Sequence, residues 1–176
     1  LSDGGFVVTW QSSYQDGDEY GIYGQKYDSS GNVAGSEFQI STSTTGRQEK
    51  SQVTALLDGG FVVTWQSPHQ GGSDYDIYGQ RYDQYGNTVN SEFIINAETN
   101  DEQQFPSISS LADGDFVATW ASYDQDGSEY GVYGQRFEAS GAPTGSEFQV
   151  NTYTTSHQAN PSITSLPDGG YLIVWN

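Results

Sequence analysis

Acidic residues gather in short loops at repeated places along the chain, and they are the best candidates for chemistry in this sequence. The residues concerned are Asp16, Asp18, Glu19, Asp74, Asp76, Asp124, Asp126 and Glu129. Ca²⁺ takes six to eight hard oxygen ligands at about 2.3–2.6 Å, often from closely spaced carboxylates in a glycine-containing loop. The pattern therefore predicts calcium as a ligand, although it lacks the full spacing of an EF-hand. The alternative is a solvated turn whose charges discourage pairing at a sheet edge.

One tyrosine follows each acidic loop, at Tyr20, Tyr75 and Tyr130. A tyrosine presents a large apolar ring together with a polar hydroxyl. Such a ring can stack on the apolar face of a sugar, while neighbouring Asn, Gln and Asp side chains bind the hydroxyls. The three tyrosines therefore indicate, as an alternative, one shallow carbohydrate site in each repeat.

No catalytic motif is visible in linear order. The sequence contains no GxSxG elbow, HExxH motif, phosphate-binding loop or cysteine nucleophile. His69 and His157 lie outside the repeated framework, and His157 is replaced by Arg47 and Glu102 in the other copies. Two carboxylates from different repeats could form a glycosidase pair, but linear order selects none. The sequence alone predicts that the chain is not an enzyme.

The elements that position these residues come from an internal repeat. The stretch LSDGGFVVTW at residue 1 returns as LLDGGFVVTW, LADGDFVATW and LPDGGYLIVW, each time 55 residues further on. The chain thus holds three copies of one unit, at 1–55, 56–110 and 111–165, and the start of a fourth at 166–176. We expect one continuous array that is a piece of a longer repetitive polypeptide.

Each copy predicts four antiparallel strands and no helix. In the first copy the strands are expected at 6–10, 22–28, 36–40 and 52–56. Apolar residues occupy both faces of 6–10, so this strand is predicted to be covered on both sides, with its tryptophan in the core. The aspartate of each Asp-Gly pair predicts an Asx turn before that strand. These aspartates are Asp3, Asp58, Asp113 and Asp168.

One basic and one acidic residue recur in the second and third predicted strands. They are Lys26, Arg81 and Arg136 on one strand, and Glu37, Glu92 and Glu147 on the other. Their positions predict a cross-strand ion pair in each copy, of the exposed kind that contributes only about 0.2–1 kcal/mol.

A tandem array of four-stranded antiparallel meanders, each about 55 residues long, predicts an all-β fold of β-propeller-like blades. The alternative is a linear stack of four-stranded sheets that forms a rod or fibre. Either arrangement depends on contacts between neighbouring units.

The composition excludes several classes of partner. The net charge is −18, from five basic and 23 acidic residues, which opposes binding to nucleic acid phosphates or to anionic lipid. Cysteine is absent, so disulfides play no part, and no apolar run is long enough to insert in a membrane.

Three repeated sequence patterns resemble the tandem repeats of very large secreted bacterial proteins. They are DGGFVVTWQS, YGQR followed by Tyr or Phe, and the dipeptide Glu-Phe shortly after a glycine. These proteins are the haemolysin-type calcium-binding or cadherin-like adhesin proteins. The resemblance covers essentially the whole chain and implies a secreted or extracellular location at the bacterial cell surface. The nonapeptide of haemolysin-type calcium rolls is absent, so their calcium ligands do not carry over.

These observations together predict a non-catalytic structural or adhesive repeat module of a large secreted bacterial surface protein. Calcium would stabilise it, and its partners would be further copies of the repeat, in the same chain or in another. The alternative is a lectin-like carbohydrate-binding β-propeller that binds surface glycans through Tyr20, Tyr75 and Tyr130.

Overall fold

The computed structural model describes residues 1–68 and 74–176, and all regular structure in these residues is β-strand. Hydrogen bonds join the strands into four antiparallel sheets, here named A to D. Sheet A contains β1 (Phe6–Ser13), β2 (Tyr20–Tyr27) and β3 (Phe38–Gln39). Sheet B contains β4 (Glu49–Ala55), β5 (Phe61–Pro68), β6 (Tyr75–Tyr82) and β7 (Thr88–Ile94). Sheet C contains β8 (Gln103–Ser110), β9 (Phe116–Tyr123), β10 (Tyr130–Phe137) and β11 (Pro143–Gln149). Sheet D contains β12 (Ser162–Ser165) and β13 (Tyr171–Val174).

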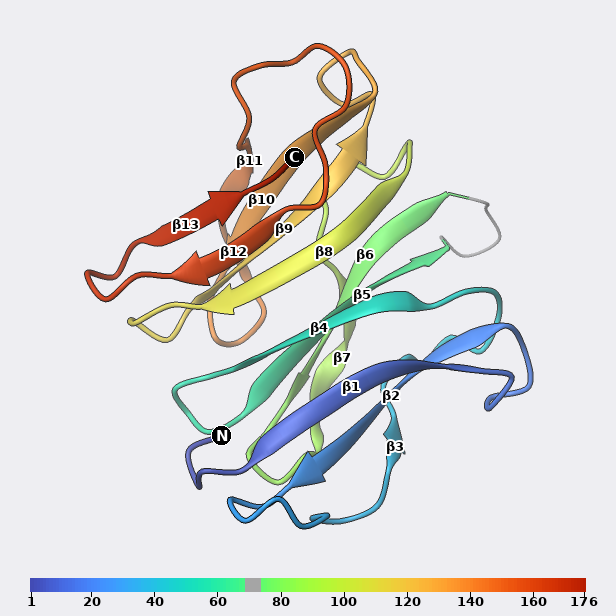
Figure 1. Cartoon of the computed structure of the whole chain (residues 1–176), viewed down its shortest axis with the longest axis vertical. Helices are drawn as coiled ribbons and strands as arrows, with labels where there is room; N and C mark the ends of the chain where they lie inside the picture. Colours follow the sequence, from blue (N-terminus) through green and yellow to red (C-terminus); the bar gives the residue numbers. More distant parts are fainter. Residues whose placement is uncertain (69–73) are drawn as a thin grey trace.

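Sheets A, B and C follow one another from the bottom to the top of Figure 1, and sheet D lies beside sheet C at the upper left. Strands β1, β4, β8 and β12 lie next to one another at the front of this stack. Within each sheet the strands follow in chain order, as an up-and-down meander. The predicted tandem meanders are thus confirmed.

Sheets B and C each combine strands from two sequence repeats. Strand β4 belongs to the repeat 1–55, yet it pairs with β5 of the next repeat, with Val53 opposite Val63. Strand β8 pairs with β9 in the same way. Each repeat therefore ends with the first strand of the following sheet.

The turn between those two strands explains this pairing. The N–H of Gly60 donates to Asp58 Oδ1 at 2.9 Å, and Gly59 has a φ of 87°, a conformation that glycine adopts without strain. The same Asx hydrogen bond forms at Asp3, Asp113 and Asp168, which confirms the predicted turn in all four copies.

The strand after this turn is buried on both faces, as predicted. Phe61, Val63 and Trp65 of β5 pack in one core with Ile22 of sheet A, whereas Val62 belongs to the core shared with sheet C. Alternate side chains of a strand point to opposite faces, so β5 contributes to two cores at once. Neighbouring sheets therefore depend on each other for burial.

The tryptophans of the repeated strand differ in burial. Trp65 and Trp120 are fully buried, as predicted for core residues. Trp10 is only partly buried, and Trp175 is 42% exposed. Sheets A and D bury this strand less than sheets B and C do.

In the described part of the chain, no helix has the length and apolar character needed to cross a bilayer.

Candidate functional site

Tyr20, Tyr75 and Tyr130 are the first residues of β2, β6 and β10. Each is paired with the last residue of the preceding strand, and for Tyr130 that residue is Tyr123. Strands β1, β5 and β9 end on the same side of the stack, toward the right of Figure 1. The places where neighbouring sheets meet on this side are called junctions: the first between sheets A and B, the second between B and C, the third between C and D.

A β-bulge at the start of β8, the first strand of sheet C, fixes the geometry of the second junction. The pairing of β8 with β9 shifts between Gln104 and Ser107, and Phe105 has a φ of 57°. The N–H of Phe105 donates to Gln66 Oε1 of sheet B at 3.0 Å, which ties the bulge to the neighbouring sheet. This arrangement brings the residues just before β8 into the second junction.

The second junction contains a pocket of about 320 Å³, lined by Asp74, Asp101, Glu102, Tyr123 and Tyr130. The residues come from three separate segments of the chain, before β6, before β8 and at the hairpin of β9 and β10. Ligand pockets typically occupy about 300–1,000 Å³ and combine aromatic walls with a few polar groups. The pocket has the size and the chemistry for a small polar ligand.

Tyr130 is held in place by contacts on several sides. Its hydroxyl donates to Glu102 Oε2 at 2.6 Å, and its ring meets Tyr123 edge-on with centroids 5.1 Å apart. The ring of His157, from the third junction, also meets it edge-on at 5.1 Å. Burial, the hydrogen bond to Glu102 and the negative charge of Glu102 all raise the pKa of Tyr130. The hydroxyl therefore stays protonated at neutral pH.

The Glu102 carboxylate is likewise oriented by its neighbours. Its Oε2 atom accepts a second hydrogen bond, from Gln104 Nε2 at 2.7 Å. Its backbone carbonyl accepts from the N–H of Tyr123 at 2.9 Å. The pocket thus presents a fixed carboxylate beside a fixed aromatic ring.

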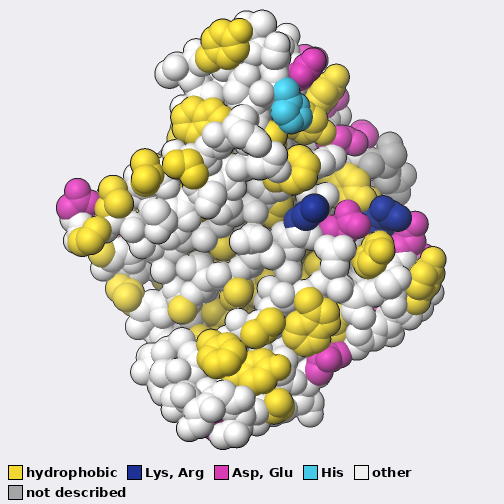
Figure 2. Space-filling view, in the orientation of Figure 1, with side chains coloured by type: hydrophobic (Ala, Val, Ile, Leu, Met, Phe, Trp, Pro, Cys, Tyr) yellow, Lys and Arg dark blue, Asp and Glu magenta, His cyan; other side chains and the backbone are white. Residues whose placement is uncertain are grey.

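The first junction carries an arginine at the position of Glu102. The guanidinium of Arg47 lies 5.5 Å from the ring centre of Tyr20, with Nε 3.3 Å from Glu19 Oε2 and Nη1 3.9 Å from Glu49 Oε1. Figure 2 shows Lys and Arg side chains gathered among Asp and Glu on the right of this face. The cation at the first junction is therefore supplied by the protein itself.

The acidic residues of the loop before β2 are engaged by protein donors. Asp16 Oδ1 accepts from the N–H of Asp18 at 3.4 Å, Asp18 Oδ2 accepts from the N–H of Gly46 at 3.0 Å, and Glu19 pairs with Arg47. These contacts are those of a solvated turn that is tied to the neighbouring sheet.

The other predicted calcium ligands are spread over three environments. Asp126 accepts from the N–H of Ser128 at 3.2 Å and from Gln149 Nε2 at 2.9 Å. Asp124 and Glu129 of the same loop are joined by a backbone hydrogen bond of 2.6 Å. Asp76 is buried and accepts from Asn96 Nδ2 at 2.7 Å, while Asp74 lines the pocket.

Within residues 1–68 and 74–176, no three His, Asp or Glu side chains are grouped so that they could hold one metal ion. Calcium binding in the acidic loops stays a prediction. His69 lies outside the described residues.

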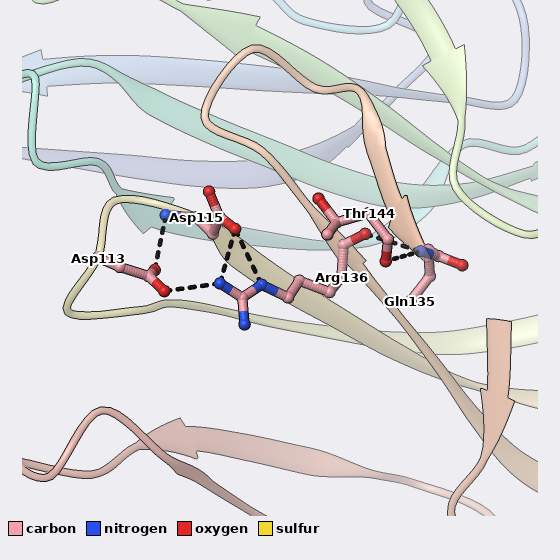
Figure 3. A network of polar contacts seen from close by, with 5 residues as sticks. All are labelled: Asp113, Asp115, Gln135, Arg136 and Thr144. Atoms are coloured by element: carbon pink, nitrogen blue, oxygen red, sulfur yellow. Dashed lines mark hydrogen bonds and ion pairs between the residues drawn. The ribbon is translucent and has the colours of Figure 1, made fainter. Parts of the chain in front are cut away.

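The predicted cross-strand ion pairs are wrong. Arg136 pairs with Asp113 at 2.6 Å and Asp115 at 2.8 Å, in the turn before β9 (Figure 3), and Arg81 pairs with Asp58 in the equivalent turn. The N–H of Asp115 and the charge of Arg136 lower the pKa of Asp113. Arginine thus reaches the turn across the neighbouring strand, and the turn aspartate binds both a backbone N–H and a guanidinium.

The glutamates of the failed prediction bind other partners. Glu92 accepts from the N–H and hydroxyl of Thr42, each at 3.0 Å, and Glu147 accepts from the N–H of Ala97 at 2.8 Å. Glu92 and Glu147 therefore connect neighbouring sheets.

Sequence reasoning missed Asp101, Glu102 and Tyr123 as site residues. The sequence did contain a signal, because one position of the repeat differs in every copy. It is Arg47 in the first copy, Glu102 in the second and His157 in the third. A residue that varies inside an otherwise repeated unit is a candidate for a function that differs between the copies.

No protein-family model and no curated protein matches the sequence. Solved structures do match. An endo-arabinase from Bacteroides thetaiotaomicron matches with a TM-score of 0.58 and 14% identity, over 98% of this chain and 66% of that one. An α-L-arabinanase from Penicillium chrysogenum, complexed with arabinobiose, matches with 0.59 and 12%, over 96% of this chain and 52% of that one. A sucrose-6-phosphate hydrolase from Lactobacillus gasseri matches with 0.60 and 9%, over 98% of this chain and 39% of that one.

The class that these matches define is the β-propeller, and the sheets of this chain are propeller-like blades, as predicted. The chain spans between 39% and 66% of the length of these three structures. At identities of 9–14% the likeness establishes the fold and not the substrate.

The comparisons correct the functional expectation. The solved structures that share this fold are enzymes named for carbohydrate substrates, which contradicts a non-catalytic structural or adhesive repeat. The expectation that the chain is not an enzyme is contradicted on the same grounds. Asp74, Asp101 and Glu102 line one pocket only in the folded chain, so no linear motif could reveal that they lie together.

Proposed function

We propose that this chain is a carbohydrate-active β-propeller that binds sugar in the pocket of the second junction. The observation that carries the proposal is Tyr130, whose ring is fixed between Tyr123 and His157 and whose hydroxyl is bonded to Glu102. Aromatic walls with a few fixed polar groups are typical of small-molecule sites. The carbohydrate substrates named for the solved structures of the same fold support the choice of ligand.

A binding experiment tests this function. Arabinobiose and a panel of neutral oligosaccharides are titrated into the chain by calorimetry, and Y130A is compared with Y85A. Tyr85 is 75% exposed on a turn and serves as the matched control. We expect Y130A to weaken binding by roughly tenfold or more, about 1.4 kcal/mol, and Y85A to leave it unchanged. Equal affinity in both variants, or no binding across the panel, contradicts the proposal.

A second candidate function is hydrolysis of the bound carbohydrate at the same pocket. It is favoured by the three carboxyl groups of Asp74, Asp101 and Glu102, which line the pocket. Glycosidases act through a pair of carboxyl groups about 5–10 Å apart on either side of the scissile bond. We expect E102Q to abolish release of reducing sugar from arabinan while neutral sugar still binds. Release that persists in E102Q excludes Glu102 as one of the pair.

We also propose that calcium binds the acidic loops, on the strength of their carboxylate content alone. Thermal unfolding in calcium chloride is compared with unfolding in sodium chloride of equal ionic strength. An increase in Tm that is specific to calcium supports binding, and superimposable curves contradict it.

A further inference from the structure

The first two junctions are built from equivalent residues but differ in charge. In the first junction Glu19 is matched by Arg47, whose side chain also lies against Tyr20. Fifty-five residues later, the equivalents of Glu19 and Arg47 are Asp74 and Glu102. The position of the internal cation is thus taken by an acid in the second junction.

A second replacement also makes the second junction more negative. Gly46, the neighbour of Arg47, is replaced by Asp101, which lines the pocket. Two of the replacements, Arg47 by Glu102 and Gly46 by Asp101, therefore make the second junction more negative than the first. Pro68 is replaced by Tyr123, which adds an aromatic wall.

The ion pairs of the arginines involve other acids than those of the pocket. Among the described residues, none of the five Lys and Arg side chains forms an ion pair with Asp101 or Glu102. Glu102 Oε2 accepts two hydrogen bonds, whereas Oε1 accepts none from the residues described. One oxygen of a fixed carboxylate is thus available to a ligand at the pocket wall.

A positively charged group meets two kinds of favourable contact in such a pocket. Carboxylates attract it, and the faces of tyrosine rings stabilise a cation within about 6 Å of their centres. The contact of Arg47 with Tyr20 and Glu19 shows the same combination inside this protein.

A sugar bearing an ammonium group fits the pocket better than a bare metal ion does. The described carboxylates do not converge on one point in the way that a metal requires. The pocket is about 320 Å³ and has two aromatic rings in its wall, which a bare ion would leave without contacts.

We propose that the second junction selects an amino sugar, whose protonated amine supplies a positive charge of the kind that Arg47 supplies in the first junction. This selectivity rests on the carbohydrate-binding function proposed above. The ammonium group binds the carboxylates of Glu102 and Asp101, and the sugar ring stacks on Tyr130. A neutral or N-acetylated sugar makes only the second of these contacts.

The test compares a glucosamine trisaccharide with its N-acetylated counterpart, by calorimetry in low salt and at slightly acidic pH, where the amine is protonated. We expect the glucosamine form to bind roughly tenfold tighter, and the difference to shrink as salt is added. E102Q, which keeps the shape of the side chain, should reduce the preference severalfold. E138Q, which removes the same charge from an exposed turn, should leave it unchanged.

A second variant, E102R, distinguishes a loss of selectivity from a failure to fold. E102R copies Arg47, and we expect it to fold, to bind the N-acetylated sugar and to lose the glucosamine form. Binding of both sugars with equal affinity overturns the selectivity but leaves carbohydrate binding intact. A preference that survives in E102R also overturns it, because the cation is then bound elsewhere. Binding of neither sugar overturns the proposed function together with the selectivity.

Discussion

At the scale of single residues, the molecule shows what one substitution inside a repeat can do. Arg47, Glu102 and His157 occupy equivalent positions, and each lies at a junction beside a tyrosine or its hydroxyl. This side chain changes the charge of each junction, and in the second junction Asp101 and Tyr123 change with it.

The buried tryptophans provide a prediction from two equivalent residues. Trp120 Nε1 donates to Gln103 Oε1 at 3.0 Å, whereas Trp65 Nε1 has no hydrogen-bond partner among the described residues. Both side chains are fully buried, so substitution by Phe removes the same volume from each. W120F also leaves Gln103 Oε1 without its donor, and we expect it to cost about 1–2 kcal/mol more than W65F. Urea unfolding of the two variants measures the difference, and equal losses of stability contradict it.

Tyr130 gives a prediction about alkaline pH. Its pKa is raised above the usual value of 10.0 by burial, by the hydrogen bond to Glu102 and by the charge of Glu102. The folded state thus holds the phenol proton more tightly than the unfolded state does. The resulting stability is complete below pH about 10 and is lost as pH rises from there through the folded pKa.

Ultraviolet titration of tyrosinate, with Y130F as the reference that identifies the signal, measures this pKa. We expect E102Q to lower it, because the carboxylate charge is removed. A Tyr130 pKa that is unchanged in E102Q contradicts the assigned cause.

At the scale of strands and turns, much of the molecule is predictable from sequence, because the local signals agree. The Asp-Gly turns and the doubly buried strand at Phe61 follow from residue type and alternation. The pairing of Arg136 with Asp113 does not, because the two residues belong to β10 and to the turn before β9, and residue type alone does not select this aspartate over Glu147 on the neighbouring strand. The bulge at Phe105 is also unpredicted, since its positive φ is unusual for a bulky residue.

The middle strands give a prediction about close packing. A Cβ atom at Gly79 would lie 3.0 Å from Phe93 Cζ and 3.1 Å from Ile95 Cδ1. We therefore expect G79A to destabilise the protein by about 1–3 kcal/mol, although alanine suits a strand better than glycine does. Thermal unfolding measures the loss.

A double-mutant cycle with F93L tests the cause of that loss. The smaller side chain should accept the new methyl group, so that G79A costs less in the F93L background. Additive effects of the two substitutions contradict the proposed contact.

At the scale of the whole molecule, charge and mutual burial act against each other. The net charge of −18 favours expansion, while the shared cores between sheets favour association of neighbouring blades. Sequence composition predicts the first effect and the repeat predicts the second. The pocket could not be predicted, because it exists only where two blades meet.

Salt dependence follows from this balance. The screening length falls from roughly 30 Å at 0.01 M to about 8 Å at 0.15 M, so carboxylates on neighbouring loops repel less as sodium chloride is added. We expect Tm to rise over this range and then to level off. A Tm that falls with salt would mean that the ion pairs of Arg47, Arg81 and Arg136 outweigh the repulsion.

The offset between sequence repeats and sheets has a consequence for how such an array can grow. Strand β4 belongs to one sequence repeat but is hydrogen-bonded into the sheet of the next repeat. Each copy is therefore joined to the following copy by strand pairing. Unequal recombination that inserts or removes one whole period, wherever the crossover falls, leaves every hairpin and every meander with its full complement of partners. Recombination can thus lengthen or shorten the array by whole units with every strand still paired, while the residue equivalent to Glu102 differs from copy to copy.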